Sequence, residues 1–492
     1  MTTPEKSQRE GVWRKITGAF ADLNSRPLAN YTMILIAVSF LTVLGVVMVF
    51  SSSMTWSVVE GSSVWGMATR QAAMVIAGLI AMWAAMRARP GTVRLLAPWL
   101  MLIAIVLLIA VLIPGIGTGR EEVGSQSWIA FGPVRFQPSE LAKVAIAVWG
   151  ASFLGVSDEK IAEDSRFLKF TVVAAIMTGL IILEGDIGMG LTFLIMVAFV
   201  LFFAGVQLYY IFAMGIVLVL GLIYLIMSGG FRSQRFTVYF DALFGRFHDT
   251  RSSSFQSYQG FLSLADGSAT GVGLGQSRAK WFYLPEAKND FIFAIVGEEL
   301  GLWGGALVVL AFLCLAFYGT QTALKSHNRY MALMAASLTA GVVTQAFINI
   351  GYVIGLLPVT GIQLPMISAG GTSAIITLGS MGLLASCARH EPEAISAMQS
   401  YGRPTVDRML MLREPDVSDI EPIRTSQPAT KQSPRREPVV RRRSTERSDA
   451  RASRGGSVDQ RSEQRRQAYR QRSRTRQTPP QPGSRPERRR NS

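Results

Sequence analysis

The sequence predicts an all-α integral membrane protein with about ten transmembrane helices. Of its 492 residues 49% are hydrophobic and only 17% are charged, and the mean hydropathy is +0.29. Soluble globular chains carry about 25% charged residues. The charge is also unevenly placed, because residues 431–492 hold 20 Lys and Arg against 6 Asp and Glu. The net charge of +16 therefore belongs mostly to the C-terminal tail, and the body has the composition of a membrane domain.

Apolar runs of roughly the 17–25 residues that a helix needs to cross a bilayer recur along the body. They lie at 31–50, 65–86, 93–113, 138–155, 168–184, 189–206, 207–227, 291–318, 330–353 and 368–388. Only Gly205 and Gln207 interrupt the sixth and seventh runs, so nine spans is the alternative. No secretory signal peptide is expected, because the first apolar run is long enough to span by itself.

Basic residues in short loops set the expected orientation. They all fall on one side of a ten-helix bundle, namely Lys6, Arg9, Arg14, Lys15, Arg26, Arg87, Arg89, Arg94, Lys325, Arg329 and Arg389. We expect that side and both termini to be cytoplasmic. Loops 114–137, 228–289 and 354–367 then face outside.

Three regions follow from this pattern. Residues 1–29 form a cytoplasmic N-terminal segment, 30–390 the membrane domain with its large extracytoplasmic loop 228–289 between the seventh and eighth helices, and 391–492 a cytoplasmic tail. The tail is rich in Arg, Ser, Gln and Pro, which predicts disorder. Such a tail can bind anionic lipid, nucleic acid or an acidic peptide. We expect membrane lipids or a protein partner, and no nucleic acid.

The large outer loop carries aromatic residues among basic ones, including Arg278, Lys280 and Lys288. An anionic ligand at the outer leaflet explains this placement, and solvated charges or contacts with lipid headgroups are the alternative. The two cysteines, Cys314 and Cys387, fall in separate apolar runs, so a disulfide framework is not indicated.

Carboxylates at the start of the eighth span are the most informative feature of the chain. Residues 283–301, YLPEAKNDFIFAIVGEELG, place Asp290 at the mouth of the span and Glu298 and Glu299 inside it. An ionisable group at the bilayer centre costs ~2.5–3.5 kcal/mol on insertion scales, so such groups are rarely there without a reason. Asp290 is either a general base or a helix N-cap. Glu298 and Glu299 lie ~12–14 Å further along the helix and are expected to pair within the bundle.

Two further motifs hold acidic residues. In residues 137–143, QPSELAK, Glu140 and Lys143 share one helix face and can pair with each other or contact a substrate; the preceding Trp128, Phe131 and Arg135 suggest an interfacial segment. The short turn EGDIG, residues 184–188, holds Glu184 and Asp186, which are candidate ligands for a divalent cation such as Mg or Mn. Turn formation alone also explains that composition.

Glycine-rich segments favour an anion site over a nucleotide site. Residues 271–277, GVGLGQS, lack the setting of a dinucleotide fingerprint, and the chain has no GxxxxGK[ST] motif, so ATP hydrolysis is not expected. The backbone of that turn can still bind pyrophosphate. Residues 357–373, LPVTGIQLPMISAGGTS, predict irregular backbone lining a cavity. The scattered histidines His248, His327 and His390 support neither a zinc site nor a Ser-His-Asp triad.

Taken in order, QPSELAKVA, EGDIG, GVGLGQS, the DFIFAIVGEELG segment and LPVTGIQLPMISAGG resemble the SEDS family of bacterial membrane glycosyltransferases over roughly residues 30–390. These motifs are more similar to those of the cell-division branch of that family than to those of the elongation branch. One departure is Lys288-Asn289, where the family commonly has His-Thr. The Arg-rich tail lies outside the resemblance.

The resemblance implies ten transmembrane helices and polymerisation of lipid II on the outer membrane face, at the division septum, beside a class B penicillin-binding protein and other division proteins. It maps the essential acid onto Asp290, which takes a proton from the acceptor hydroxyl while undecaprenyl pyrophosphate leaves. The candidate substrate-binding residues are Arg70, Glu140, Lys143, Arg278, Lys280, Lys288, Ser368, Gly370 and Gly371. A lipid II flippase and a non-catalytic division scaffold are the alternatives.

Overall fold

The computed structural model describes residues 18–19, 21–59, 65–120, 124–132, 134–155, 165–227, 239–240, 244, 253–280, 284 and 287–416. The chain divides into two units, Met1–Arg424 and Thr425–Ser492, and the second lies outside the described residues.

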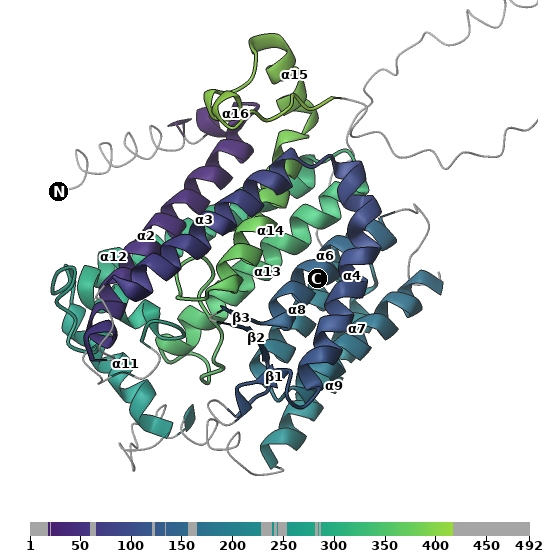
Figure 1. Cartoon of the computed structure of the whole chain (residues 1–492). Coiled ribbons are helices and arrows are strands. Elements are labelled where there is room, and N and C mark those ends of the chain that lie inside the picture. Colours follow the sequence, from purple (N-terminus) through teal and green to yellow (C-terminus); the bar gives the residue numbers. More distant parts are fainter. Residues whose placement is uncertain are drawn as a thin grey trace, which may run out of the picture. The chain divides into compact units, whose positions relative to one another are not determined.

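A helix lies in each of the ten apolar ranges that the sequence predicts (Figure 1). They are α2 (Ala29–Val59), α3 (Gly66–Arg87), α4 (Pro90–Leu112), α6 (Pro138–Leu154), α7 (Ser165–Leu183), α8 (Ile187–Phe203), α9 (Leu208–Met227), α12 (Ile292–Lys325), α13 (Arg329–Val353) and α14 (Thr372–Arg389). Among the described residues six of these, α2, α3, α4, α7, α12 and α13, are long and apolar enough to cross a membrane. The chain is therefore a multi-pass membrane protein, and the count of ten spans stays a prediction.

The uncertain split of residues 189–227 is resolved in favour of two helices. α8 ends at Phe203 and α9 begins at Leu208, with Gly205 between them at a φ of +86°. That φ lies in the left-handed region, which glycine enters without steric cost.

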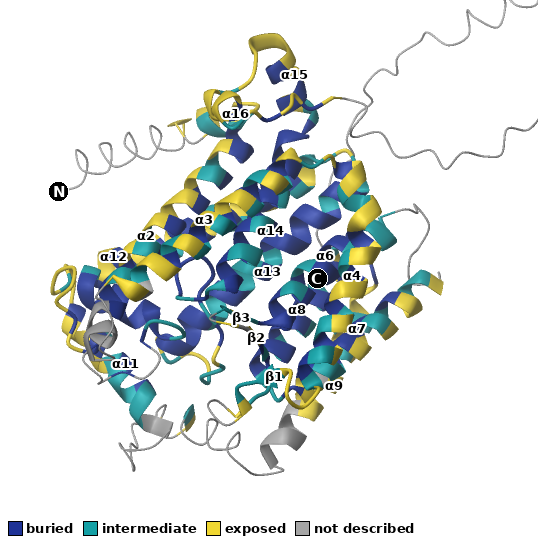
Figure 2. Ribbon diagram, viewed as in Figure 1, coloured by how far each residue is buried: buried dark blue, intermediate teal, exposed yellow. Residues whose placement is uncertain are grey.

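The interior of the bundle is formed by α6, α8, α13 and α14, where Figure 2 shows the buried residues. α3 packs along α14, α12 packs against both α2 and α13, and α4 packs against α6. The outward faces of the peripheral helices are apolar and exposed, as Leu95, Trp99 and Val106 show on α4. Apolar side chains facing outward suit a lipid environment, where they lose nothing by exposure.

A small antiparallel sheet departs from the all-α expectation. β1 (Gly117–Thr118), β2 (Trp128–Phe131) and β3 (Val134–Phe136) pair in that order within the loop between α4 and α6. Strands of two to four residues are too short to produce a recognisable alternation in the sequence. The large outer loop also contains a helix, α11 (Ser253–Gly267).

The folded part continues past the predicted boundary at residue 390, so the expectation that the disordered tail begins at 391 is wrong. α15 (Pro392–Tyr401) and α16 (Thr405–Met409) follow α14 directly. Asp407 is fully buried, 2.8 Å from Arg389 and 2.6 Å from the Tyr31 hydroxyl. Although this stretch is mostly polar, Asp407 is buried in it and connects it to Arg389 of α14 and to Tyr31 of α2. The predicted disorder beyond residue 416 lies outside the described residues.

The long helix α12 is broken near its start. Gly301 has a φ of +69° and a ψ of −166°, so the segment before it forms a separate short helix that carries Glu298 and Glu299. The break leaves backbone groups without helical partners, and the segment after α11 supplies them. The N–H groups of Val272 and Gly273 donate to the carbonyls of Glu298 and Glu299, at 2.9 and 3.0 Å.

Candidate active site

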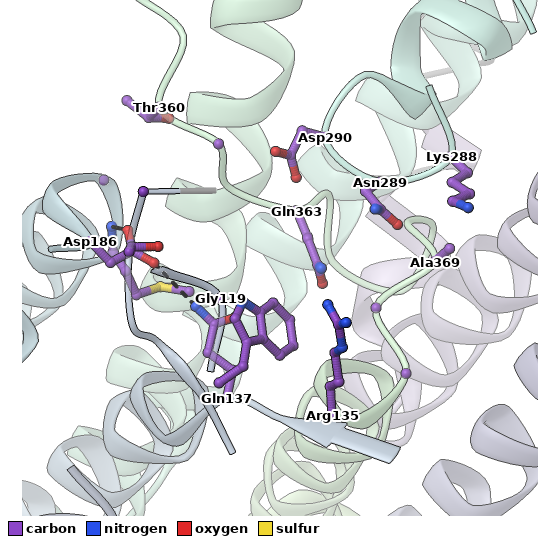
Figure 3. Close-up of a pocket in the computed structure, with 18 of the residues that line it drawn as sticks. Gly119, Arg135, Gln137, Asp186, Lys288, Asn289, Asp290, Thr360, Gln363 and Ala369 are labelled. Carbon is purple, nitrogen blue, oxygen red and sulfur yellow. Dashed lines mark hydrogen bonds between the residues drawn. The ribbon is translucent and has the colours of Figure 1, made fainter. Parts of the chain in front are cut away.

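A cavity of about 1090 Å³ lies among the C-terminal part of α2, the start of α3, the sheet segment, the turn between α7 and α8, the residues before α12 and the loop 357–371 (Figure 3). Its charged lining residues are Arg70, Arg135, Asp186, Lys288 and Asp290. Three cations and two carboxylates thus share one cavity, which suits a ligand that carries both negative charge and hydroxyl groups.

Asp290 lies in a turn immediately before α12, and Figure 3 shows its side chain pointing into the cavity. The N-cap position of α12 belongs to Phe291, one residue later. The alternative that placed Asp290 at the N-cap is therefore wrong for this structure. The carboxylate lies instead at the cavity wall, half-buried, where a bound hydroxyl can reach it.

The loop 357–371 forms the neighbouring wall, as its Pro and Gly content predicts. Gly370 and Gly371 line the cavity, whereas Ser368 does not and instead ties this loop to the residues before α12. The Ser368 hydroxyl donates to the Asn289 carbonyl at 2.6 Å and accepts from the Leu364 N–H at 2.8 Å. At Gly370 a Cβ atom would lie 2.4 Å from the Gln363 side-chain oxygen, so a larger residue there would displace Gln363 from its position in the cavity wall.

Cationic side chains reach the cavity from three different elements. Arg70 comes from α3, Arg135 from β3 and Lys288 from the segment before α12. In Figure 3 the guanidinium of Arg135 points toward Gln363. Guanidinium and ammonium groups gathered in this way bind phosphate oxygens well.

The two acids proposed as cation ligands have different surroundings. Asp186 caps α8, because its Oδ1 accepts from the Met189 N–H at 2.9 Å, and its Oδ2 accepts from Gln137 at 3.2 Å. Glu184 is buried, and neither of its carboxyl oxygens has a hydrogen-bond partner among the described residues. Burial, and to a lesser extent the charge of Asp186, raises the pKa of Glu184 to about 9.

Asp186 is already engaged as the cap of α8, and a divalent cation held by Glu184 and Asp186 stays a prediction. The part of the chain that the structure describes also contains no group of three or more His, Cys, Asp or Glu residues placed to hold a metal. Asp186 lines the cavity, and Glu184 is not among its lining residues.

Glu140 and Lys143 lie inside α6, outside the cavity lining. Their side chains form the predicted ion pair at 3.1 Å, and both are buried. Lys143 also donates to the Gln345 side-chain oxygen on α13. The pair therefore joins α6 to α13 in the interior.

The segment that carries Arg278 and Lys280 lies against the break of α12. The backbone N–H of Arg278 donates to the Glu298 carboxylate at 2.6 Å, the Arg278 side chain is exposed, and the Lys280 ammonium lies 3.4 Å from Glu299. The Ser277 hydroxyl adds a 2.7 Å bond to Glu298 and the Ser51 hydroxyl one of the same length to Glu299. Pairing of Glu298 and Glu299 within the bundle is confirmed. None of these residues lines the cavity.

Several lining residues were not candidates from the sequence. Arg135 was assigned to an interfacial segment, and Gln71, Gln137 and Gln363 carry no charge that would single them out. Gln137 is the first residue of one recognised motif, QPSELAK, and Gln363 lies within another. Only the folding of distant segments onto one another identifies these four as neighbours of Asp290.

The fold and the site together define a helical membrane protein with an acid-bearing, cation-lined cavity at one end of the bundle. A family model described as cell cycle protein, FtsW/RodA/SpoVE, matches residues 31–393. The chain belongs to this family.

Individual relatives agree with that assignment. A probable peptidoglycan glycosyltransferase FtsW from Mycobacterium tuberculosis is 39% identical over 416 residues, which cover 84% of this chain and 78% of the relative. Stage V sporulation protein E from Bacillus subtilis is 36% identical over 359 residues, 73% of this chain and 96% of the relative.

Solved structures share the fold at lower identity. A chain from a peptidoglycan synthase complex that coordinates polymerization and crosslinking gives a TM-score of 0.58 at 22% identity, covering 73% of this chain and 97% of that one. RodA from Thermus thermophilus gives 0.51 at 23%, covering 73% and 96%. At these identities the likeness shows the fold alone.

Proposed function

We propose that this protein is a peptidoglycan glycosyltransferase that polymerises lipid II into glycan strands at the outer face of the cytoplasmic membrane during septal wall synthesis. The observation that carries the proposal is the position of Asp290, in the wall of a cavity that also holds Arg70, Arg135 and Lys288. The names of the FtsW relatives support the reaction class.

The proposed reaction needs one base. Asp290 accepts the proton of the 4-hydroxyl on the acceptor sugar as that oxygen attacks the anomeric carbon of the donor, which inverts the configuration there. The new glycosidic C–O bond forms while the bond from the anomeric carbon to the pyrophosphate oxygen breaks. Undecaprenyl pyrophosphate leaves as a stable anion, so no separate acid has to protonate it.

The cations of the cavity fit the charge that develops in this reaction. Negative charge grows on the pyrophosphate as the bond breaks, and fixed cations that face it lower the barrier. Arg70, Arg135 and Lys288 are the residues placed for this role. The sugar–phosphate bond supplies the driving force, so no nucleoside triphosphate is required. Assays with added Mg or Mn and with chelator test for the predicted help from a divalent cation.

The length of α14 supports a position of the site at the outer face of the membrane. The helix begins at Thr372, next to the cavity residue Gly371, and ends at Arg389. Its 18 residues span about 27 Å at 1.5 Å per residue, close to the thickness of a bilayer core. If Arg389 lies at the cytoplasmic side, as the positive-inside rule predicts, the cavity opens on the other side. Both termini are then cytoplasmic, and a class B penicillin-binding protein is the proposed partner outside.

To test the proposal, the purified protein and its transpeptidase partner are incubated with labelled lipid II in detergent, and the formation of glycan strands is measured. A parallel experiment in vesicles follows transfer of labelled lipid II between leaflets. Polymer formation without transfer supports the proposal. Transfer without polymer would favour the flippase, and neither activity, together with recruitment of division proteins, would favour the scaffold.

A further inference from the structure

Three consecutive backbone carbonyls before α12 are each held by a hydrogen bond from elsewhere in the fold. The Lys288 carbonyl accepts from the Ala369 N–H at 3.0 Å, and the Asn289 carbonyl accepts from the Ser368 hydroxyl at 2.6 Å. The Asp290 carbonyl lies 2.9 Å from both the Asn349 side-chain nitrogen and the Tyr352 hydroxyl. The residue that carries the candidate base is therefore fixed through its main chain.

Asn349 and Tyr352 lie one turn apart on the same face of α13, and their polar ends are 2.6 Å apart. Both are buried, at 0% and 1% exposed. The same two groups also contact the Ile362 carbonyl, at 2.7 and 2.6 Å. One pair of side chains thus joins the segment before α12 to the loop 357–371, and these segments form adjacent walls of the cavity.

We propose that Asn349 and Tyr352 are positioning residues that set the location of the Asp290 carboxylate. This inference rests on the proposed function, in which Asp290 is the general base. Residues 287–290 form a turn outside any helix or sheet, so donors from other segments restrain them, and the Asn349 and Tyr352 side chains are the donors at Asp290. A base must come within about 2.6–3.2 Å of the proton it takes. A displacement of about 1 Å can lower the rate by about 100-fold.

The Tyr352 hydroxyl serves to position the segment before α12 more than to pack the core. α13 is well packed by its apolar residues, and Tyr352 already contacts Phe291 ring to ring, with centroids 5.7 Å apart. The hydroxyl adds contacts to the two carbonyls and to Asn349, and its single O–H donates to one carbonyl at a time. Removing that one oxygen leaves the ring and the helix in place and removes this shared donor.

Tyr352→Phe is the direct test, and the chain offers a matched control. Tyr330 lies on the same helix and is 1% exposed, yet its hydroxyl has no hydrogen-bond partner among the described residues. Tyr330→Phe makes the same chemical change in an equally buried place far from the cavity. Each purified full-length variant is examined in two ways, by lipid II polymerisation and by hydrogen exchange of the backbone around residues 284–292.

We expect Tyr352→Phe to lower kcat about 10- to 100-fold, with little change in KM for lipid II, because Arg70 and Arg135 lie on other elements and the Lys288 carbonyl keeps its bond from the Ala369 N–H. Exchange in residues 284–292 should accelerate about fivefold, the factor that corresponds to one lost hydrogen bond of about 1 kcal/mol. Tyr330→Phe should match wild type in both measurements. Asn349→Ala should reproduce the acceleration of exchange.

Equal exchange in the two Tyr→Phe variants would overturn the inference, as would a loss of kcat without any change in exchange at residues 284–292. A rise in KM with unchanged kcat would also overturn it, since it would assign Tyr352 to substrate binding. If wild-type protein makes no glycan, the proposed function fails while the exchange measurement still decides whether Asn349 and Tyr352 hold this segment.

Discussion

The ammonium of Lys280 lies 3.4 Å from Glu299 at the break of α12, and the side chains of both residues are almost fully buried, at 3% and 0% exposed. The pair joins the glycine-rich turn after α11 to the short helix that follows Asp290. The same turn supplies the backbone donors for the carbonyls freed at Gly301. Charge pairing and backbone pairing therefore stabilise the same break in the helix.

Replacing Lys280 with Met should destabilise the protein strongly. Removing one partner of a buried ion pair leaves an uncompensated charge and typically costs about 3–5 kcal/mol. Lys325→Met is the matched control, because Lys325 pairs with Glu393 at 3.1 Å in an exposed setting, where such pairs contribute about 0–1 kcal/mol. Thermal unfolding in detergent should show a large fall in Tm for the first variant and a small one for the second. Similar shifts in both would contradict this account of the break.

Glu184 should make stability depend on pH. Its pKa is raised from 4.5 to about 9 in the folded protein, so between these values the folded state binds a proton that the unfolded chain releases. Stability from this group is therefore full below about 4.5 and is lost as the pH rises toward about 9. Glu184→Gln should remove that loss and give a higher Tm than wild type at the alkaline end. Glu414→Gln, at an exposed position, should follow wild type, and the same behaviour of both variants would refute the prediction.

Truncation should locate the end of the folded domain. A chain that ends after Asp416 keeps Asp407 beside Arg389 and should retain the Tm of the full-length protein. A chain that ends after Glu391 loses Asp407 and the Arg413 carbonyl, both of which accept from the Arg389 guanidinium, and should have a lower Tm. Asp407→Asn in the full-length chain separates loss of the charge pair from loss of the segment. Equal stability of the two truncations would show that α15 and α16 contribute nothing.

Lys288→Gln should weaken binding of the anionic donor substrate, lipid II. A charged hydrogen bond at a partly exposed site contributes about 1–2 kcal/mol, so KM for lipid II should rise about 5- to 30-fold. Its dependence on salt should also become shallower. Arg278→Gln is the informative comparison, because Arg278 is a basic residue of the same outer loop and was a candidate from the sequence, yet it does not line the cavity. A larger rise in KM for Arg278→Gln than for Lys288→Gln would contradict this assignment. It would favour the prediction from sequence that Arg278 binds the substrate.

The sequence predicted most helices because apolar run length is a direct consequence of bilayer thickness. It also identified Asp290 and Lys288 as candidate site residues, since a charged segment meets an apolar run there, and both line the cavity. It failed to predict the sheet, whose longest strand has four residues, and α15 and α16, whose polar surface outweighs a few buried contacts.

The neighbours of Asp290 depend on tertiary structure. Arg278 and Lys280 are near Asp290 along the chain, but the break at Gly301 turns their segment toward Glu298 and Glu299. Arg135 and Gln363 are far from Asp290 or uncharged, and reach the cavity through the sheet and the loop 357–371. Asn349 is a single amide within a helix, and no local pattern indicates that it contacts the Asp290 carbonyl.

The most direct test of the central claim is lipid II polymerisation by Asp290→Asn, measured beside Asp266→Asn and wild type after all three are shown to be folded. Asp266 is exposed on α11 and does not line the cavity, so it controls for loss of one negative charge. We predict glycan strands from wild type and Asp266→Asn, with polymerisation by Asp290→Asn lower by a factor of about 100 or more, the range of general-base catalysis. Equal glycan from all three proteins would contradict the assignment of Asp290 as the base.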